Sequence, residues 1–236
     1  MNTPPHALIT GSARRIGRAI ALALAEQGFD ITIHYNTSAQ DAQTLAKTIT
    51  SMGRKAQIIQ ADLSNHEGIQ ALAGAMENLD LTALINNANL FMSDDKDPSG
   101  RRHHMVNVIA PRLLSEAFAR FQRKGSIVTL LDSTLFFVKN MEHYKQSRLA
   151  ARADIFALAK ALAPQVTINA INLGPTLIAA SQTQEHFNQL CACTPLKKPV
   201  ALEDITQGIL FLLSSQSITG SFLDIDNGCH LLHGNF

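Results

Sequence analysis

Short apolar runs alternate with amphipathic stretches of helical period along this chain. The first apolar run, Ala7–Thr10, ends at Gly11 and is followed by a helical pattern from Ile16 to Gln27. Further strand-like runs lie at residues 31–35, 56–60, 83–85, 126–131, 167–171 and 222–225. Further helical stretches lie at residues 41–52, 106–121, 144–162 and 203–214. Because connections that contain a helix join parallel strands, the pattern predicts an α/β fold with a doubly wound parallel sheet of Rossmann type.

The alternation runs through the chain without a repeat, a low-complexity tract or a stretch of linker composition. We therefore expect residues 1–236 to form a single domain. Two polar stretches interrupt the rhythm, at Met92–Arg102 and Leu177–Thr194. Ligands of doubly wound sheets bind at the carboxyl ends of the strands, where both stretches emerge. Both are candidate walls of a substrate site, and the second is a candidate lid.

Charge and composition exclude several classes of partner. The chain has 20 Lys and Arg against 19 Asp and Glu, so its formal net charge of +1 favours neither a nucleic acid nor an anionic membrane surface. The expected ligand is a small molecule. The first residues lack a signal-peptide pattern, and no apolar run approaches the roughly 20 residues that cross a bilayer. The three cysteines are an odd number, which fits a reducing compartment, so we expect a soluble, cytoplasmic protein.

The cysteines and histidines show no metal-binding pattern. Cys191 and Cys193 have no matching framework of Cys or His, so we expect no metal site. We interpret His103, His104 and His143 as surface or loop histidines.

The segment Thr10–Gly17, with the sequence TGSARRIG, turns from the first predicted strand into the first predicted helix. Backbone N–H groups and the positive end of a helix face outward from such a turn, which suits a pyrophosphate. The alternative is an ordinary tight turn, because Arg15 stands where a dinucleotide-binding turn most often has its middle glycine. Its place at the first β-to-α junction of a repeated βαβ pattern favours the dinucleotide site.

The residues that end the second strand favour NADPH over NADH. NAD-binding sheets usually have Asp or Glu there, which bonds the ribose 2′-hydroxyl and would repel a 2′-phosphate. This chain has no acid in that window and offers amide and hydroxyl groups at Asn36, Thr37 and Ser38. Arg14 and Arg15 lie within the turn Thr10–Gly17 and would attract the extra charge of the 2′-phosphate. The alternative is that these arginines are solvated surface charges.

Several ordered motifs make the whole chain resemble the short-chain dehydrogenase/reductase family. The family's first motif is TGxxxGxG, and the form with arginine at the middle glycine resembles pteridine reductases and bacterial dihydromonapterin reductases. Asn86-Asn87-Ala88 is similar to the NNAG motif, and Asp226-Asn227-Gly228 is similar to the terminal DGG. The resemblance implies that NADP(H) contacts Gly11, Arg14, Arg15, Ile16, Asn36, Thr37, Ser38, Asp62, Leu63, Asn87, Ala88, Tyr144, Arg148, Gly174 and Thr176.

The resemblance also implies a catalytic group. Tyr144 matches the family tyrosine, but Arg148 stands four residues on where the family has lysine. Residues four apart share a helix face, so the guanidinium can favour the ionised phenol and ease proton donation. Asp132 aligns with the family's catalytic serine, as in pteridine reductases, and Ser133 stays an alternative. Asn107 matches the active-site asparagine, which would hold a helix kink or an ordered water.

The resemblance points to a pterin-like substrate. Phe91 stands where pteridine reductases stack the pterin, and Arg15, Asp132 and Tyr144 complete the implied substrate contacts. The implied reaction is NADPH-dependent hydride transfer to a pterin or dihydrofolate-like ring, with Tyr144 as proton donor. One alternative is a general carbonyl or 3-oxoacyl reductase. Another, suggested by the missing lysine, is a catalytically weak dinucleotide-binding sensor or structural subunit. Family members usually form homotetramers.

Overall fold

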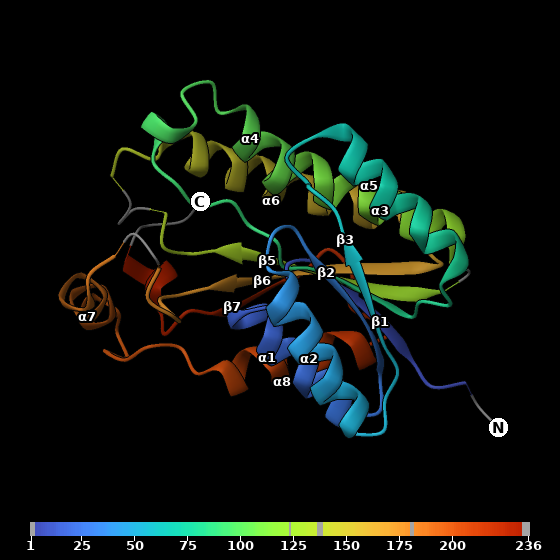
Figure 1. The fold of residues 1–236 in the computed structure, drawn as a ribbon. Coiled ribbons are helices and arrows are strands. Elements are labelled where there is room, and N and C mark those ends of the chain that lie inside the picture. The colour runs from blue at the N-terminus through green and yellow to red at the C-terminus, as the bar shows by residue number, and fades with distance from the viewer. Residues whose placement is uncertain (1–2, 123, 136–138, 180–181, 233–236) are drawn as a thin grey trace.

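The computed structural model describes residues 3–122, 124–135, 139–179 and 182–232. Seven parallel strands form one sheet in the order β3-β2-β1-β4-β5-β6-β7, which confirms the predicted doubly wound α/β fold (Figure 1). The strands are β1 (His6–Ile9), β2 (Asp30–Tyr35), β3 (Ala56–Gln60), β4 (Ala83–Asn86), β5 (Gly125–Asp132), β6 (Val166–Leu173) and β7 (Phe222–Ile225).

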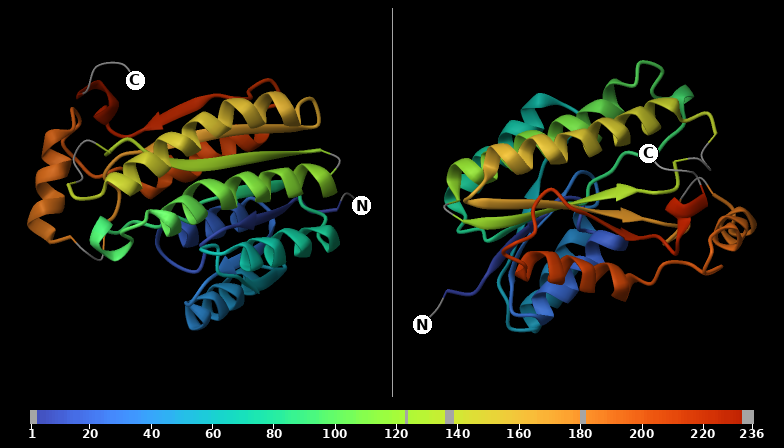
Figure 2. Two further views of the ribbon diagram at one scale, coloured as in Figure 1. Left: turned by 90° about the horizontal axis from the view of Figure 1, so that it is seen from above. Right: turned by 180° about the vertical axis from the view of Figure 1, so that it is seen from behind.

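Helices cover both faces of this sheet. One layer holds α1, α2 and α8, and the other holds α3, α4, α5 and α6, as Figure 1 and the right view of Figure 2 show. Each layer packs its own apolar cluster against the strands, so the sheet is buried on both sides. The helices are α1 (Arg15–Glu26), α2 (Ala39–Ser51), α3 (His66–Ala75), α4 (Arg101–His104), α5 (Ala110–Phe121), α6 (Glu142–Leu162), α7 (Gln184–Cys193) and α8 (Leu202–Ser214). Within the described residues no helix is long and apolar enough to cross a membrane.

Two helices were not predicted from the apolar pattern. Helix α3 is capped by Asn65, whose side chain accepts a hydrogen bond from the N–H of Gly68 at 2.8 Å. Helix α7 is capped in the same way by Thr183 and lies inside the polar stretch expected to be a lid. Both helices are short and bury few residues, so the helical period of their apolar residues is weak. Their N-caps are nevertheless of the usual residue types.

The segment before α5 also differs from the prediction. Helical structure begins at Arg101 rather than Val106, and a π-helical turn over Met105–Ile109 joins α4 to α5. A π turn inside a helix is uncommon and often marks a functional position. This one carries Asn107, close to the carboxyl ends of β4 and β5.

Candidate functional site

The glycine turn between β1 and α1 is held tightly against the β4 loop. Gly11 has a φ of +64°, a conformation that favours glycine. A Cβ atom on Gly17 would lie 2.5 Å from the carbonyl oxygen of Gly11, so this position also needs glycine. The side chain of Asn87 donates hydrogen bonds to the carbonyls of Thr10 and Gly11, at 2.8 and 3.1 Å. The backbone N–H of Ala88 donates to Thr10 Oγ1 at 2.9 Å, so the NNA segment buttresses the turn.

The two arginines of the turn lie in different environments. Arg14 is exposed, with its Nε 3.6 Å from a carboxylate oxygen of Asp41 at the start of α2. Arg15 has a φ of +57°, and its Nη2 donates to the carbonyl oxygens of Leu177 and Ile178 at 3.2 and 2.8 Å. Arg15 therefore ties the turn to the segment that leaves β6, a contact that the sequence pattern did not suggest.

A histidine that sequence analysis did not single out is bonded to the same turn. His34 in β2 is 2% exposed, and its Nδ1 accepts a hydrogen bond from the N–H of Gly11 at 3.0 Å. Because Nδ1 is an acceptor, the proton is on Nε2, which donates to the carbonyl of Ala61 at 3.1 Å. Burial lowers the pKa of His34 to about 4, against a weaker opposing effect of the bond to Ala61. The ring is therefore neutral at physiological pH.

His34 should make the stability of the fold depend on pH. Its pKa is about 4 in the folded protein and 6.5 ordinarily, so between these values the unfolded chain binds more protons. The free energy of unfolding then falls as the pH falls through this window. We expect protonation of His34 in the unfolded chain to lower the free energy of unfolding by about 2 kcal/mol between pH 7 and pH 5. Urea denaturation of the protein and its His34→Asn variant measures this loss, and an equal pH dependence in both proteins would contradict it.

The polar residues after β2 lie beside the end of β3. Asn36 and Thr37 are exposed and Ser38 is partly exposed. The amide of Asn36 donates to Asp62 Oδ1 at 3.2 Å, and the pKa of Asp62 is lowered chiefly by its hydrogen bond from the backbone of Ser64. The neighbouring Leu63 is 4% exposed and belongs to the core, so only its backbone can face a ligand.

A phenol and a carboxylate meet at the carboxyl end of β5. Tyr144, in the first turn of α6, donates its hydroxyl hydrogen to Asp132 Oδ2 at 2.5 Å. Asn89 approaches the same hydroxyl, with Nδ2 at 3.4 Å. The other carboxylate oxygen of Asp132 accepts from the backbone and hydroxyl of Thr134. The hydroxyl of Ser133 is buried and has no hydrogen-bond partner among the described residues, so the residue that contacts Tyr144 is Asp132 and not the alternative Ser133.

Arg148 lies one helical turn from Tyr144 and is 5% exposed. Its Nη2 donates to the carbonyl of Leu130, while its buried Nε has no partner. The pKa of Tyr144 is nevertheless raised well above its ordinary value of 10, first by burial and then by the charge of Asp132. Arg148 acts in the expected direction, because its charge lowers the pKa of Tyr144, but burial and the charge of Asp132 outweigh it. The phenol stays protonated at neutral pH.

Asn107 joins the β4 loop to helix α6. Its Oδ1 accepts from the N–H of Leu90 at 2.8 Å, and its Nδ2 donates to the carbonyl of Leu90 at 3.1 Å and to Ser147 Oγ at 3.0 Å. The hydroxyl of Ser147 in turn donates to the carbonyl of Tyr144 at 2.7 Å. Asn107, on the π-helical turn, thus reaches across from the β4 loop to helix α6.

Two rings pack against the ring of Tyr144. Phe91 meets it edge to face, with the ring centroids 5.0 Å apart and the planes at 89°. The ring of His103 also meets it edge to face, with the ring centroids 6.3 Å apart. His103 is fully buried, so its interpretation as a surface or loop histidine is wrong. Asp97 explains the burial, because its Oδ2 accepts from both the backbone N–H and Nδ1 of His103, at 3.0 and 2.8 Å. The apolar pattern of the sequence could not reveal this pairing.

The polar stretch Met92–Arg102 holds the N-terminal end of helix α6. The carboxylate of Asp94 accepts hydrogen bonds from the N–H groups of Glu142 and His143, at 2.8 and 3.1 Å. It therefore caps helix α6 from a distant part of the sequence, where the residue preceding the helix supplies no side-chain cap. The ring of His143 also contacts the carbonyl of Pro98 at 3.1 Å. This stretch fixes the end of the helix that carries Tyr144.

The segment after β6 packs against the turn that follows β7. A Cβ atom on Gly174 would lie 2.6 Å from the carbonyl oxygen of Asp226. Thr176 is buried, and its hydroxyl donates to the carbonyl of Gly174 at 2.9 Å. Gly174 and Thr176 therefore set the path of the chain as it leaves β6 toward Arg15.

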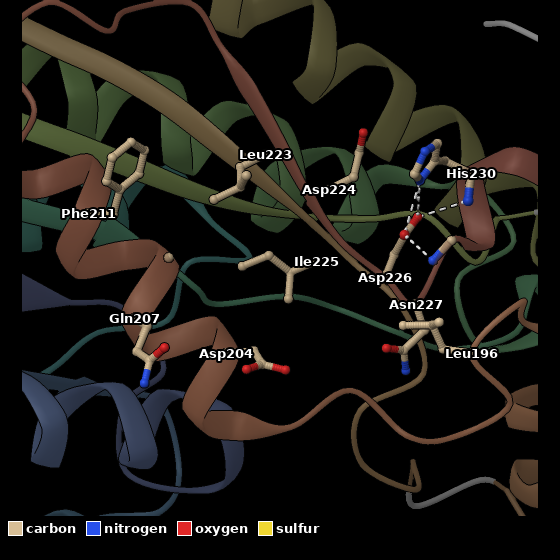
Figure 3. Close-up of a pocket in the computed structure, with 12 residues that line it drawn as sticks. Leu196, Asp204, Gln207, Phe211, Leu223, Asp224, Ile225, Asp226, Asn227 and His230 are labelled. Carbon is tan, nitrogen blue, oxygen red and sulfur yellow. Dashed lines mark hydrogen bonds and ion pairs between the residues drawn. The ribbon is translucent and has the colours of Figure 1, made fainter.

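A hollow that Tyr144 does not line lies along β7 and α8, and Figure 3 shows its lining side chains. Asp224, Asp226 and His230 bring possible ligand atoms within 4.8 Å of one another there. The carboxylate of Asp226 already accepts from the N–H groups of Gly228 and His230 and contacts the His230 ring. The segment that resembles DGG thus forms a capped turn.

Comparisons with known proteins show the family and the fold. A family model described as enoyl-(acyl carrier protein) reductase matches residues 11–230. The crystal structure of FolM alternative dihydrofolate reductase 1 from Brucella canis, complexed with NADP, superposes with a TM-score of 0.90 at 30% identity, covering 98% of this chain and 96% of that one.

Two curated relatives extend over nearly the whole chain. The uncharacterized oxidoreductase YgfF of Escherichia coli is 28% identical over 94% of this chain and 98% of its own length. The 3-oxoacyl-[acyl-carrier-protein] reductase FabG of Staphylococcus aureus is 27% identical over 98% of this chain and all of its own. Since the family model spans nearly the whole chain and the fold and motifs agree, this protein belongs to the short-chain dehydrogenase/reductase family of oxidoreductases.

Proposed function

We propose that this protein is an NADPH-dependent reductase that transfers a hydride to a pterin or dihydrofolate-like ring, with Tyr144 as the proton donor. The observation that carries the proposal is the Tyr144–Asp132 hydrogen bond of 2.5 Å, beside Phe91 and one turn from Arg148. The likeness to a FolM dihydrofolate reductase complexed with NADP supports both the cofactor and the substrate class.

The residues around the glycine turn fit a dinucleotide. The turn needs glycine at positions 11 and 17, Ser12 Oγ is buried there without a partner, and the first N–H groups of α1 are free to bind pyrophosphate. The 2′-phosphate would be bound by Asn36, Thr37, Ser38 and Arg14. Arg14 is paired with Asp41 at the exposed surface, and the phosphate can compete with this weak ion pair. Asp62 and the backbone of Leu63 would flank the adenine. The remaining proposed contacts are Arg15, Ile16, Asn87, Ala88, Tyr144, Arg148, Gly174 and Thr176.

The bound nicotinamide supplies the hydride, and the chain supplies the proton. Ionising Tyr144 next to an ionised Asp132 would place two negative charges about 2.5 Å apart, which is costly in a buried site. Burial and the charge of Asp132 therefore both oppose the loss of the proton from Tyr144. Arg148 offsets part of the negative charge when the proton leaves Tyr144 for the substrate.

The same pair favours a pterin over a simple ketone. The hydroxyl of Tyr144 donates its hydrogen to Asp132, so a substrate can receive it only if another donor takes its place at the carboxylate. The amino-pyrimidine edge of a pterin carries N–H donors that can replace the phenol at the carboxylate and release the hydroxyl. A ketone has no such donor. Phe91 adds an aromatic surface for a flat ring.

A substrate and cofactor panel tests this proposal. We expect tighter binding of NADPH than NADH, and NADPH oxidation with dihydropterins or dihydrofolate that exceeds the rate with simple ketones and 3-oxoacyl thioesters. Absorbance of NADPH follows the turnover, and fluorescence titration gives the cofactor affinities. Tighter binding of NADH, or turnover of ketones alone, contradicts the proposal.

Two other functions remain as outcomes of this panel. Turnover of 3-oxoacyl thioesters would favour the carbonyl reductase, which the likeness to FabG supports. Tight NADPH binding without turnover would favour a sensor or structural subunit, which the arginine at position 148 supports.

Exposed apolar side chains support assembly into a homotetramer. Leu149 and Phe156 on α6 are 41% and 52% exposed, and Phe211 on α8 is 54% exposed. Apolar side chains exposed on two different helices suit contacts with further copies of the chain. Light scattering on the purified protein measures the assembly state.

A further inference from the structure

We propose that His34 is a positioning residue for the pyrophosphate turn, an inference that rests on the cofactor site proposed above. The imidazole is fully enclosed and touches the turn at Gly11. The N–H of Ser12 also donates to the backbone carbonyl of His34, at 3.0 Å. The N–H groups of Gly11 and Ser12 therefore both point into the protein at one residue of β2.

The turn is thereby fixed from two sides. Asn87 binds its carbonyl oxygens at Thr10 and Gly11, and His34 binds its N–H groups at Gly11 and Ser12. With these groups occupied, the chain must direct its later N–H groups, at the start of α1, toward the ligand. Such fixed dipoles bind an anion without the cost of reorganising the loop.

Of the two contacts that His34 makes with the turn, the one to Gly11 uses the imidazole, whereas the one to Ser12 uses the backbone carbonyl of His34. If Nδ1 is removed, the N–H of Gly11 loses its acceptor inside the protein. Gly11 is already in a left-handed conformation and is free to rotate, because it has no Cβ. The turn would then sample orientations that do not present its N–H groups to a pyrophosphate.

The two nitrogens of His34 can be tested separately with amides. Asparagine has the reach to place its carbonyl oxygen near the position of Nδ1, whereas glutamine places its amide nitrogen near that of Nε2. His34→Asn therefore keeps the acceptor for Gly11 and loses the donor to Ala61. His34→Gln keeps the donor and loses the acceptor. The strand pairing of Ala61 survives in both variants, because its N–H donates to the carbonyl of Tyr35.

Cofactor titration and thermal unfolding of the three proteins test the inference. We expect His34→Gln to raise the Kd of NADPH about tenfold and His34→Asn to leave it within about threefold, with similar losses of Tm in both. NADH, which carries the same pyrophosphate, should weaken by the same factor. Equal Kd values in both variants, or changes in Kd that merely follow Tm, overturn the positioning role. If the unaltered protein itself does not bind NADPH, the proposed function fails, and this inference fails with it.

Discussion

Tyr144→Phe is expected to lower kcat for pterin reduction by about 10²- to 10⁴-fold, the usual contribution of a positioned general acid. Phenylalanine keeps the ring that packs on Phe91 and His103, so the shape of the site is retained. Only the hydroxyl bonded to Asp132 is lost. Steady-state kinetics with NADPH and a dihydropterin measure the fall, while the Kd of NADPH should stay within about threefold, since one hydroxyl contact is worth little in net terms.

The chain offers a matched control for this substitution. Its sequence contains only two tyrosines, and the second, Tyr35, ends β2 and packs against the core. Tyr35→Phe removes the same hydroxyl from a position remote from Asp132 and should leave kcat unchanged. A Tyr144→Phe enzyme that retains the kcat of the unaltered protein would rule out Tyr144 as the proton donor.

Arg148→Met is expected to lower kcat by about 10²-fold, comparable to the loss of one preorganised charge or donor at an active site. Arg148 lowers the pKa of Tyr144 against burial and the charge of Asp132, and the hydrogen bond from Asn89 acts in the same direction more weakly. Without it the phenol becomes a still weaker acid. Arg148→Lys restores a cation at this place and should keep kcat within about tenfold of the unaltered enzyme.

Stability separates this catalytic effect from damage to the fold. Methionine fills a similar volume and removes a buried Nε that has no partner, so Tm should change little. Lys145 is the control on the same helix, because it is turned away from Tyr144 and pairs with Glu142 at 3.9 Å. Lys145→Met should keep full activity. If Arg148→Met also does so, the guanidinium has no part in the chemistry.

The prediction failed where the apolar pattern of the sequence carries little information about burial. The parallel sheet was predictable, because strands that are buried on both faces consist of continuous apolar runs. Helices α3 and α7 were missed because few of their residues are buried and their local signal is weak. The burial of His103 was missed because its partner Asp97 compensates it, and no apolar period records such a pairing.

The sequence by itself determined the alternation of strands and helices, the glycine turn at the first β-to-α junction, and the placement of Tyr144 and Arg148 on one helix face. Each of these depends on neighbours within a few residues, so local spacing is enough to specify it. Only the tertiary structure decided that Asp132 rather than Ser133 meets Tyr144, that Asp94 caps the helix carrying it, and that His34 holds the turn at Gly11. These contacts join residues 12 to 49 positions apart, and they form only when the sheet brings different elements to the same edge.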